Sequence, residues 1–417
     1  MGGDLIITGG MPLNGTVHIP AAKNSVLPLL AASMLCGDVR LRAVPRLSDV
    51  AASLALLRGA GCAARWEGED ILVSGTPQNS NLPGQTAEQM RASILFCAPL
   101  LAKLGRAETS LPGGCNIGAR PIDLHLAALR ELGAEITERY GELRCKAKCL
   151  RGTDITLAIP SVGATENAIL AACGAEGTSV IYNAAREPEI VDLQALLRSM
   201  GARVNGAGGS IITVEGGAAL HGCTHRVIGD RIVCATYLCA AAAAGGEVRL
   251  TGVDYRAVST VALSLAESGC EVRSEADAVS LRSTGALRSV RPVRTAPYPG
   301  FPTDAQPVLM AALLRSEGCT VFVENIFENR YRHVDELSRM GAEIRVAGRV
   351  AVVNGVRTLH GAAVKCTDLR GGAALVIAGL SAEGTTRVTE LTHIDRGYDA
   401  IERDLAALGA QIRRETT

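Results

Sequence analysis

The 417-residue sequence has little of several features that would place it directly in a class of protein. Aromatic residues make up 3% of it, and Trp66 is the single tryptophan, which argues against the aromatic platforms on which single-stranded nucleic acid stacks. Lysine plus arginine and aspartate plus glutamate both number 42, so no net charge attracts nucleic acid or an acidic membrane. Any anionic ligand must therefore be held by a local cluster of charges.

Targeting signals and long apolar runs are also missing. Met1–Thr8 has no basic region and only a three-residue apolar run, which excludes a signal peptide. Ile6 stands where a myristoylation motif requires Ser or Thr. The alanine-rich run Ala235–Ala244 is too short to cross a bilayer. We therefore expect a cytoplasmic protein without a membrane partner.

The thirteen cysteines do not form a recognisable framework. Cys145 and Cys149 have no second pair and no nearby histidines, so zinc-finger spacing is absent and we expect no metal. An odd number of scattered thiols fits a reducing compartment. The sequence contains neither a Walker A loop nor a Gly-x-Gly-x-x-Gly fingerprint, which excludes the nucleotide-binding folds that carry them.

What the sequence does contain is one pattern repeated six times: a leucine, a glycine four residues later, and then a small residue. The glycines are separated by 72, 68, 68, 72 and 68 residues and are Gly61, Gly133, Gly201, Gly269, Gly341 and Gly409. Each suits the left-handed residue that ends a helix, and a short strand follows it. A unit of about 70 residues suits a small βαβ-containing subdomain rather than a solenoid repeat. We predict two similar domains of three units each.

The predicted boundary follows the third unit, near Gly229–Ile232. The opening strand Asp4–Thr8 precedes the first unit, so we expect it to close the last one. The first domain is then 21–229, and the second is discontinuous, comprising 1–20 and 230–417. Two crossovers would leave a cleft between the domains, where ligands usually bind.

The stretch with the most chemical character is Leu111–Asp123. Cys115 lies in a glycine-rich segment, five residues before Arg120. A thiol beside a fixed cation has a lowered pKa and reacts as a nucleophile or a proton donor. The alternative is a small apolar cysteine in a surface turn.

Charged residues are expected at the ends of several elements. Lys23 and Asn24 precede a predicted helix, Ser25–Leu35, where the lysine, the N–H groups and the helix dipole would form an anion site. Arg91 is expected in the first turns of a helix that a capping box, Thr86–Gln89, begins. The alternative for both cations is an ordinary place on the surface.

The second half of the sequence adds further charges at such ends. These are Asp304, Arg330, Arg332, His333, Asp368, Arg370, His393 and Arg396. Any one alone would be a salt-bridged helix cap. Five arginines and a lysine at element ends, in a chain of zero net charge, indicate a site for several phosphate or carboxylate groups.

With these residues assembled, the chain resembles the enolpyruvyl transferases, and among them those whose acceptor is UDP-N-acetylglucosamine. The matching segments run nearly end to end and are Ala22–Asn24, Met90–Ser93, Gly114–His125, Ser161–Asn167, Glu187–Asp192, Tyr298–Asp304, Phe327–Arg330, Asp368–Arg370 and His393–Tyr398. The resemblance implies an α/β fold: a two-domain inside-out α/β barrel, each domain having three βαβαββ repeats around a pseudo-threefold axis.

The resemblance also implies a reaction. The enolpyruvyl group of phosphoenolpyruvate passes to the 3′-hydroxyl of UDP-N-acetylglucosamine and phosphate leaves, without metal or cofactor, as the first committed step of peptidoglycan biosynthesis. Cys115 matches the proton donor and Asp304 the general base. Contacts to phosphoenolpyruvate match Lys23, Arg120 and Arg396, with Arg330 and Arg370 nearby. Lys23 and Arg396 are expected to be catalytic together with Cys115 and Asp304. Contacts to the UDP-sugar match Asn24, Arg91, Arg120, Pro121, Ile122, Asp123, Leu124, Pro160, Ser161, Val162, Asp304 and Ile326.

Four positions depart from the family's pattern, and two alternatives stay open. The departures are Ala21, Val233, Ala235 and Ala305, none of which does chemistry in the family. One alternative is the sister 5-enolpyruvylshikimate-3-phosphate synthases, which have no cysteine loop and carry serines at Lys23 and Asn24. The other is a non-catalytic paralogue that binds UDP-sugar. We expect a monomer with small-molecule partners only.

Overall fold

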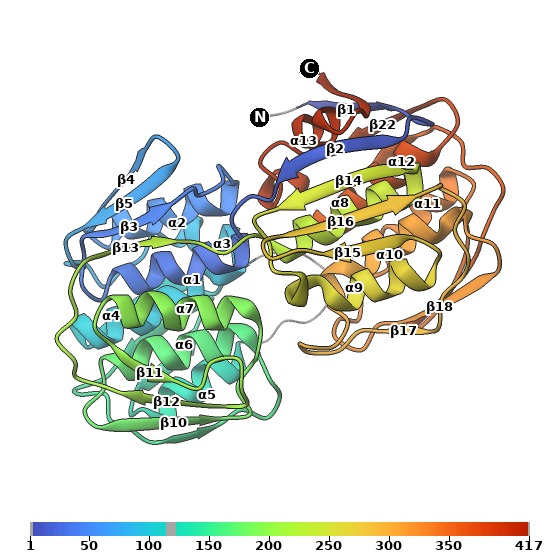
Figure 1. Cartoon of the computed structure of the whole chain (residues 1–417). Helices are drawn as coiled ribbons and strands as arrows, with labels where there is room; N and C mark the ends of the chain where they lie inside the picture. Colours follow the sequence, from blue (N-terminus) through green and yellow to red (C-terminus); the bar gives the residue numbers. More distant parts are fainter. Residues whose placement is uncertain (1–2, 114–121, 416–417) are drawn as a thin grey trace. The chain divides into compact units, whose positions relative to one another are not determined.

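The computed structural model describes residues 3–113 and 122–415. They form two compact units, each with its own hydrophobic core. The first unit comprises residues 21–113 and 122–228, and the second comprises 3–20 and 229–415 (Figure 1). The predictions that concern Cys115, Arg120 and Pro121 lie outside the described residues.

Three sheets form the outside of the first unit. Their strand orders are β13-β3-β5-β4, β6-β8-β7 and β11-β12-β10-β9. The strands are β3 (Val39–Arg42), β4 (Ala63–Glu67), β5 (Asp70–Ser74), β6 (Arg106–Ser110), β7 (Glu135–Arg139), β8 (Glu142–Lys146), β9 (Asp154–Thr156), β10 (Thr178–Tyr182), β11 (Arg203–Asn205), β12 (Ile211–Glu215) and β13 (Cys223–Arg226).

The helices of the first unit belong to two classes. Buried helices are apolar on nearly every face, as in α1 (Lys23–Ser33), α4 (Cys97–Leu104) and α6 (Val162–Cys173). A helix that is hydrophobic all round belongs in a core. The remaining helices bury one side only and are α2 (Ser48–Gly59), α3 (Gly84–Gln89), α5 (Asp123–Glu131) and α7 (Pro188–Ser199).

The second unit repeats this plan with sheets in the orders β15-β16-β14-β2, β17-β18-β20-β19 and β21-β22-β1-β23. Its strands are β1 (Asp4–Thr8), β2 (Leu13–His18), β14 (Gly246–Thr251), β15 (Glu271–Ser274), β16 (Ala278–Ser283), β17 (Val293–Arg294), β18 (Cys319–Val323), β19 (Glu343–Ala347), β20 (Val350–Asn354), β21 (Ala363–Lys365), β22 (Thr385–Thr389) and β23 (Gln411–Glu415). The antiparallel pairing of β1 with β22 and with β23 confirms that the opening strand closes the last repeat.

Three buried helices fill the middle of the second unit and pack on one another (Figure 1). They are α8 (Arg231–Ala244), α10 (Gln306–Ala312) and α12 (Leu369–Ser381), and every residue of α12 is buried. Outer helices are α9 (Tyr255–Glu267), α11 (Val334–Arg339) and α13 (Ile401–Ala407). Small side chains, such as Ala240–Ala243 in α8, suit this close packing.

The six repeated glycines end the six outer helices as predicted. All have positive φ, between 92° and 110°. The N–H of the residue after each glycine donates to the carbonyl of the leucine five positions earlier, at 2.9–3.2 Å, which is the Schellman closure of a helix. The sequence pattern therefore marks one backbone device used six times.

Two predictions about helix starts are wrong. Thr86 is the third residue of α3, which begins at Gly84, so it does not cap that helix. Met90 is extended, with φ −138° and ψ 137°, and this break separates α3 from Arg91. Arg91 begins the short 3₁₀ segment η1 (Arg91–Phe96), and α4 begins only at Cys97. In α1 the helix begins earlier than predicted and includes Lys23.

Across the part of the chain that the structure describes, none of the helices combines the length and the apolar character that crossing a membrane requires.

Candidate active site

Asp304 lies in a cluster of charges in the second unit, which we call the arginine–aspartate cluster (Asp304, Arg330, Asp368 and Arg370). Asp304 belongs to the short 3₁₀ segment η2 (Thr303–Ala305), which leads into α10. Oδ1 of Asp304 accepts from Arg330 Nη2 at 2.6 Å, and Oδ2 accepts from Arg370 Nε at 3.1 Å. The side chains of Arg330 and Arg370 are 2% and 3% exposed, whereas that of Asp304 is 28% exposed. Asp304 is therefore the member of the cluster that solvent reaches.

Arg330 is fixed by groups other than Asp304. Its Nε and Nη2 donate to the carbonyl of Thr303 at 3.2 and 3.1 Å, and Nη1 lies 3.9 Å from Asp368 Oδ1. Asp368 in turn caps α12, since Oδ1 accepts from the backbone N–H groups of Arg370 and Gly371. A carboxylate at a helix N-terminus is stabilised by those N–H groups and by the helix dipole.

Arg370, the second residue of α12, is held by a chain of hydroxyl groups. Its Nη1 donates to the Tyr398 hydroxyl at 3.2 Å, and that hydroxyl lies 2.8 Å from Thr236 Oγ1 on α8. Burial opposes protonation of Arg370, but the acidic groups of Tyr398, Asp304 and Asp230 outweigh it and raise the pKa of the guanidinium above its usual value. Arg370 is thus a permanent cation in a buried position.

Two glycines of α12 let other elements approach this cluster closely. A Cβ at Gly371 would lie 2.9 Å from His333 Cβ, and one at Gly372 would lie 2.7 Å from Ile394 Cγ1. Ile394 begins the 3₁₀ segment η4 (Ile394–Arg396), which carries the partly exposed Arg396. The glycines therefore set how near the segments of Arg330 and Arg396 come to α12.

His333 is a buried imidazole beside this cluster. Burial lowers its pKa to about 4, the charge of Arg330 acts in the same direction, and that of Asp368 opposes both. His333 is consequently neutral at pH 7 and adds no charge to the cluster.

In the first unit, Lys23 is the first residue of α1 and its side chain is buried. Its Nζ lies 2.7 Å from Asp49 Oδ2, and Asp49 stands in the first turn of α2. The carboxylate compensates for a cation placed at the positive end of a helix dipole. Sequence reasoning missed Asp49, whose only local signal is an acidic residue near a helix start.

Most of the other expected site residues of the first unit also stand where a helix begins. Asn24 is the second residue of α1, Asp123 and Leu124 begin α5 directly after Ile122, and Val162 begins α6 after Pro160 and Ser161. Ser161 caps α6 by accepting from the N–H of Ala164 at 3.4 Å. In the second unit, Ile326 lies in a loop, where its N–H donates to Glu324 Oε1 at 2.8 Å.

Sequence reasoning also missed a group of buried carboxyls in the first unit. Glu166 on α6 is buried, and burial raises its pKa well above the usual range, with the carboxylates of Glu189 and Glu187 adding to the effect. Burial and the two neighbouring carboxylates thus both disfavour the charged form of Glu166. Glu166, Glu187 and Glu189 lie in segments that resemble the enolpyruvyl transferases, but no sequence pattern indicated that the three side chains would lie near one another.

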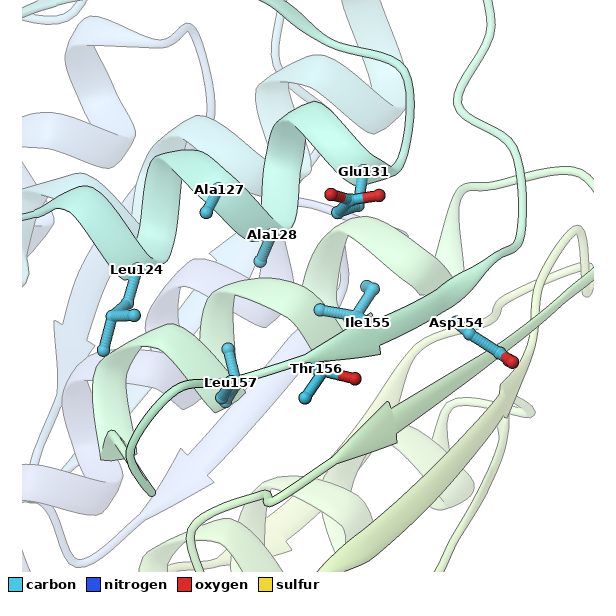
Figure 2. A pocket seen from close by; sticks show the side chains of 8 residues that line it. All are labelled: Leu124, Ala127, Ala128, Glu131, Asp154, Ile155, Thr156 and Leu157. Atoms are coloured by element: carbon cyan, nitrogen blue, oxygen red, sulfur yellow. The ribbon is translucent and has the colours of Figure 1, made fainter.

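A pocket of about 210 Å³ lies between α5 and β9 (Figure 2). Residues that line it include Leu124, Ala127, Glu131, Asp154, Thr156 and Leu157. Leu124 is one of the expected acceptor contacts, so the pocket adjoins that segment. Within residues 3–113 and 122–415, no three histidine, cysteine, aspartate or glutamate side chains gather in a way that would hold a metal ion.

Comparison with known proteins identifies the family. Residues 7–405 match the family model described as EPSP synthase (3-phosphoshikimate 1-carboxyvinyltransferase). A protein of Gluconacetobacter diazotrophicus named UDP-N-acetylglucosamine 1-carboxyvinyltransferase is 49% identical over 414 residues, which cover 98% of each chain. One of the same name from Nitratidesulfovibrio vulgaris is 46% identical and covers 99% of each chain.

Solved structures agree with this assignment. The enolpyruvyl transferase NikO from Streptomyces tendae aligns over 100% of both chains with a TM-score of 0.88 and 26% identity. EPSP synthase from Acinetobacter baumannii, 18% identical, aligns over 99% of this chain and 100% of its own with a TM-score of 0.77, which shows a common fold. The predicted fold, a two-domain inside-out α/β barrel, is confirmed. The chain belongs to the enolpyruvyl transferase family.

Proposed function

We propose that this chain transfers the enolpyruvyl group of phosphoenolpyruvate to the 3′-hydroxyl of UDP-N-acetylglucosamine and releases phosphate. The observation that carries the proposal is the arginine–aspartate cluster, which presents one solvent-accessible carboxylate beside two buried guanidinium groups. The carboxylate suits removal of a hydroxyl proton, and the cations suit an anionic co-substrate. Relatives that are 46–49% identical over nearly the whole chain and are named for this reaction support the choice of acceptor.

The reaction proceeds by addition and elimination. The acceptor hydroxyl oxygen bonds to C2 of phosphoenolpyruvate while its proton passes to a base, and the double-bond electrons take a proton at C3. The tetrahedral intermediate then loses phosphate from C2 and a proton from the new methyl group, which restores the double bond. One acid and one base on opposite sides of the reacting carbon atoms are sufficient for this sequence.

We assign the base to Asp304 and the proton donor at C3 to Cys115, which lies outside the described residues. Lys23, Arg120 and Arg396 are proposed to bind phosphoenolpyruvate, together with Arg330 and Arg370. The burial of Lys23 beside Asp49 supports its part, because a fixed ammonium group orients an anion better than a mobile surface lysine does.

The acceptor is proposed to bind at helix starts of the first unit and at two positions of the second. The residues are Asn24, Arg91, Arg120, Pro121, Ile122, Asp123, Leu124, Pro160, Ser161, Val162, Asp304 and Ile326. The N-termini of α1, α5 and α6 support this proposal, because backbone N–H groups and the helix dipole favour anionic groups such as a diphosphate. We propose that the two compact units are the family's two domains, with limits close to 21–229 and to 1–20 plus 230–417.

Phosphate release tests the proposal. The full-length chain with phosphoenolpyruvate is expected to release phosphate when UDP-N-acetylglucosamine is added and not when shikimate 3-phosphate replaces it. Release with shikimate 3-phosphate alone would identify the sister synthase. Binding of UDP-N-acetylglucosamine without any release would identify a non-catalytic paralogue.

A further inference from the structure

The contacts of Asp304 bear on when it can act as the proposed base. Both of its carboxylate oxygens accept hydrogen bonds from guanidinium groups, at 2.6 Å from Arg330 and at 3.1 Å from Arg370. Hydrogen bonds from cations stabilise the charged form of a carboxylate and make it a poor proton acceptor. The reaction therefore requires a step in which Asp304 leaves at least one of these partners.

The two arginines, which we call the arginine pair, are positioned independently of Asp304. Arg330 donates to the Thr303 carbonyl and lies near Asp368, and Arg370 donates to the Tyr398 hydroxyl. Both side chains are almost completely buried. Removing Asp304 would leave two fixed guanidinium groups directed at the place of a carboxylate.

Asp304 differs from the aspartates at the starts of the other central helices. Aspartates also stand at the starts of the other two central helices, where Asp230 caps α8 and Asp368 caps α12 through side-chain hydrogen bonds to backbone N–H groups. The side chain of Asp304 instead accepts from the arginine pair, and it is the most exposed of the cluster.

We propose that Asp304 occupies the arginine pair in the substrate-free protein as an internal carboxylate, and that the carboxylate of phosphoenolpyruvate displaces it. This inference rests on the proposed function. A guanidinium binds a carboxylate or a phosphate with two parallel hydrogen bonds, and phosphoenolpyruvate carries both groups. Because its phosphate is assigned to Lys23, Arg120 and Arg396, its carboxylate is the group left for the arginine pair. Asp304, released from the arginine pair, becomes a competent base only when the co-substrate is present.

Ligand binding distinguishes this exchange from a purely structural ion pair. Dissociation constants for phosphoenolpyruvate and for inorganic phosphate are measured by calorimetry without acceptor. All proteins carry Cys115→Ser, which prevents a covalent adduct. Asp304→Ala removes the internal competitor, so the dissociation constant for phosphoenolpyruvate should fall by roughly tenfold, the loss of one charge-assisted contact. The constant for inorganic phosphate should change far less, because phosphate is expected to bind first at Lys23, Arg120 and Arg396.

Asp304→Asn is the second variant, because it keeps the size of the side chain and its amide oxygen can still accept a hydrogen bond from one of the two buried guanidinium groups. It should also tighten phosphoenolpyruvate binding, by less than Asp304→Ala, and circular dichroism shows whether each variant is folded. An unchanged or weaker affinity for phosphoenolpyruvate in the folded variants would overturn the exchange. Equal tightening of phosphate would overturn it too, since it would show a general field effect.

Measurements on the parent chain distinguish failure of the exchange from failure of the proposed function. If it releases phosphate with UDP-N-acetylglucosamine but the Asp304 variants bind phosphoenolpyruvate no more tightly, the exchange alone is wrong. If it binds no phosphoenolpyruvate and releases no phosphate, the proposed function is wrong.

Discussion

At the scale of single residues, the two arginine side chains beside Asp304 are held in place by hydrogen bonds to uncharged hydroxyl and carbonyl groups. The Tyr398 hydroxyl contacts both Arg370 and Thr236, and the Thr303 carbonyl accepts two hydrogen bonds from Arg330. Such groups orient a guanidinium without neutralising it. We infer that they determine where the arginine pair directs its N–H groups.

Tyr398→Phe tests this positioning role. Loss of one hydroxyl removes the hydrogen bonds to Arg370 and Thr236, so turnover should fall several-fold while the Michaelis constant for UDP-N-acetylglucosamine stays unchanged. The matched control is Tyr237→Phe, which removes a hydroxyl that donates to Asp404 Oδ2 at 2.8 Å in the same unit. Both substitutions should cost about 1 kcal/mol of stability. Equal loss of turnover in the two variants would contradict a specific role for Tyr398.

His333 should make the stability of the protein depend on pH. Its pKa is about 4 in the folded protein and about 6.5 when unfolded, so at pH 5 the unfolded chain binds a proton that the folded chain does not. The free energy of unfolding carries no penalty from His333 above pH 6.5, and the penalty grows as the pH falls toward 4. The free energy of unfolding should drop by roughly 2 kcal/mol more between pH 7 and pH 5 in the parent than in His333→Gln. Urea unfolding at both pH values measures this, and identical drops would refute the assignment.

At the scale of secondary-structure elements, one helix ending recurs six times and depends on a left-handed residue. Gly269, with φ 110°, is the clearest test, because a Cβ added there would meet no atom within 4 Å. Gly269→Ala should therefore cost about 1 kcal/mol through backbone strain alone. Gly269→Asn should cost less, because asparagine tolerates this conformation better. Thermal unfolding compares the two, and a larger loss for asparagine would point to packing instead.

Much of this level could be predicted from the sequence, because helix endings depend on neighbours within a few residues. The Schellman closure joins positions five apart, so a leucine, a glycine and a small residue are enough to reveal it. The capping box at Thr86–Gln89 shows the limit of such reasoning. Its residue types were right for a cap, but the extended Met90 ends α3, and nothing in the pattern indicated that break.

The partners within the candidate site could not be predicted in the same way. Lys23 meets Asp49, and Thr236 meets Tyr398 across 162 positions of the chain. Contacts of this kind are created where α1 packs on α2 and where α8 meets the segment that follows η4, and they leave no periodic trace in the sequence. Charged residue types and their places at helix ends were predictable, whereas the pairing among them required the structure.

At the scale of the whole molecule, the chain consists of two units built on one plan, each with three sheets outside and buried helices inside. Equal numbers of acidic and basic residues leave no global field, so recognition of anions depends on a few local groups. The proposed chemistry draws its residues from both units. Lys23 belongs to the first, and Asp304 with its arginine pair belongs to the second.

The product formed in heavy water tests the central claim most directly. Full-length protein, phosphoenolpyruvate and UDP-N-acetylglucosamine are incubated in D₂O, and the sugar nucleotide is analysed by mass spectrometry and proton NMR. We predict an enolpyruvyl ether at the 3′-oxygen with deuterium in its vinyl group, because addition places a solvent-derived hydrogen on C3 before elimination removes one. Phosphate release with an unmodified sugar nucleotide, or an enolpyruvyl product without vinyl deuterium, would contradict the account.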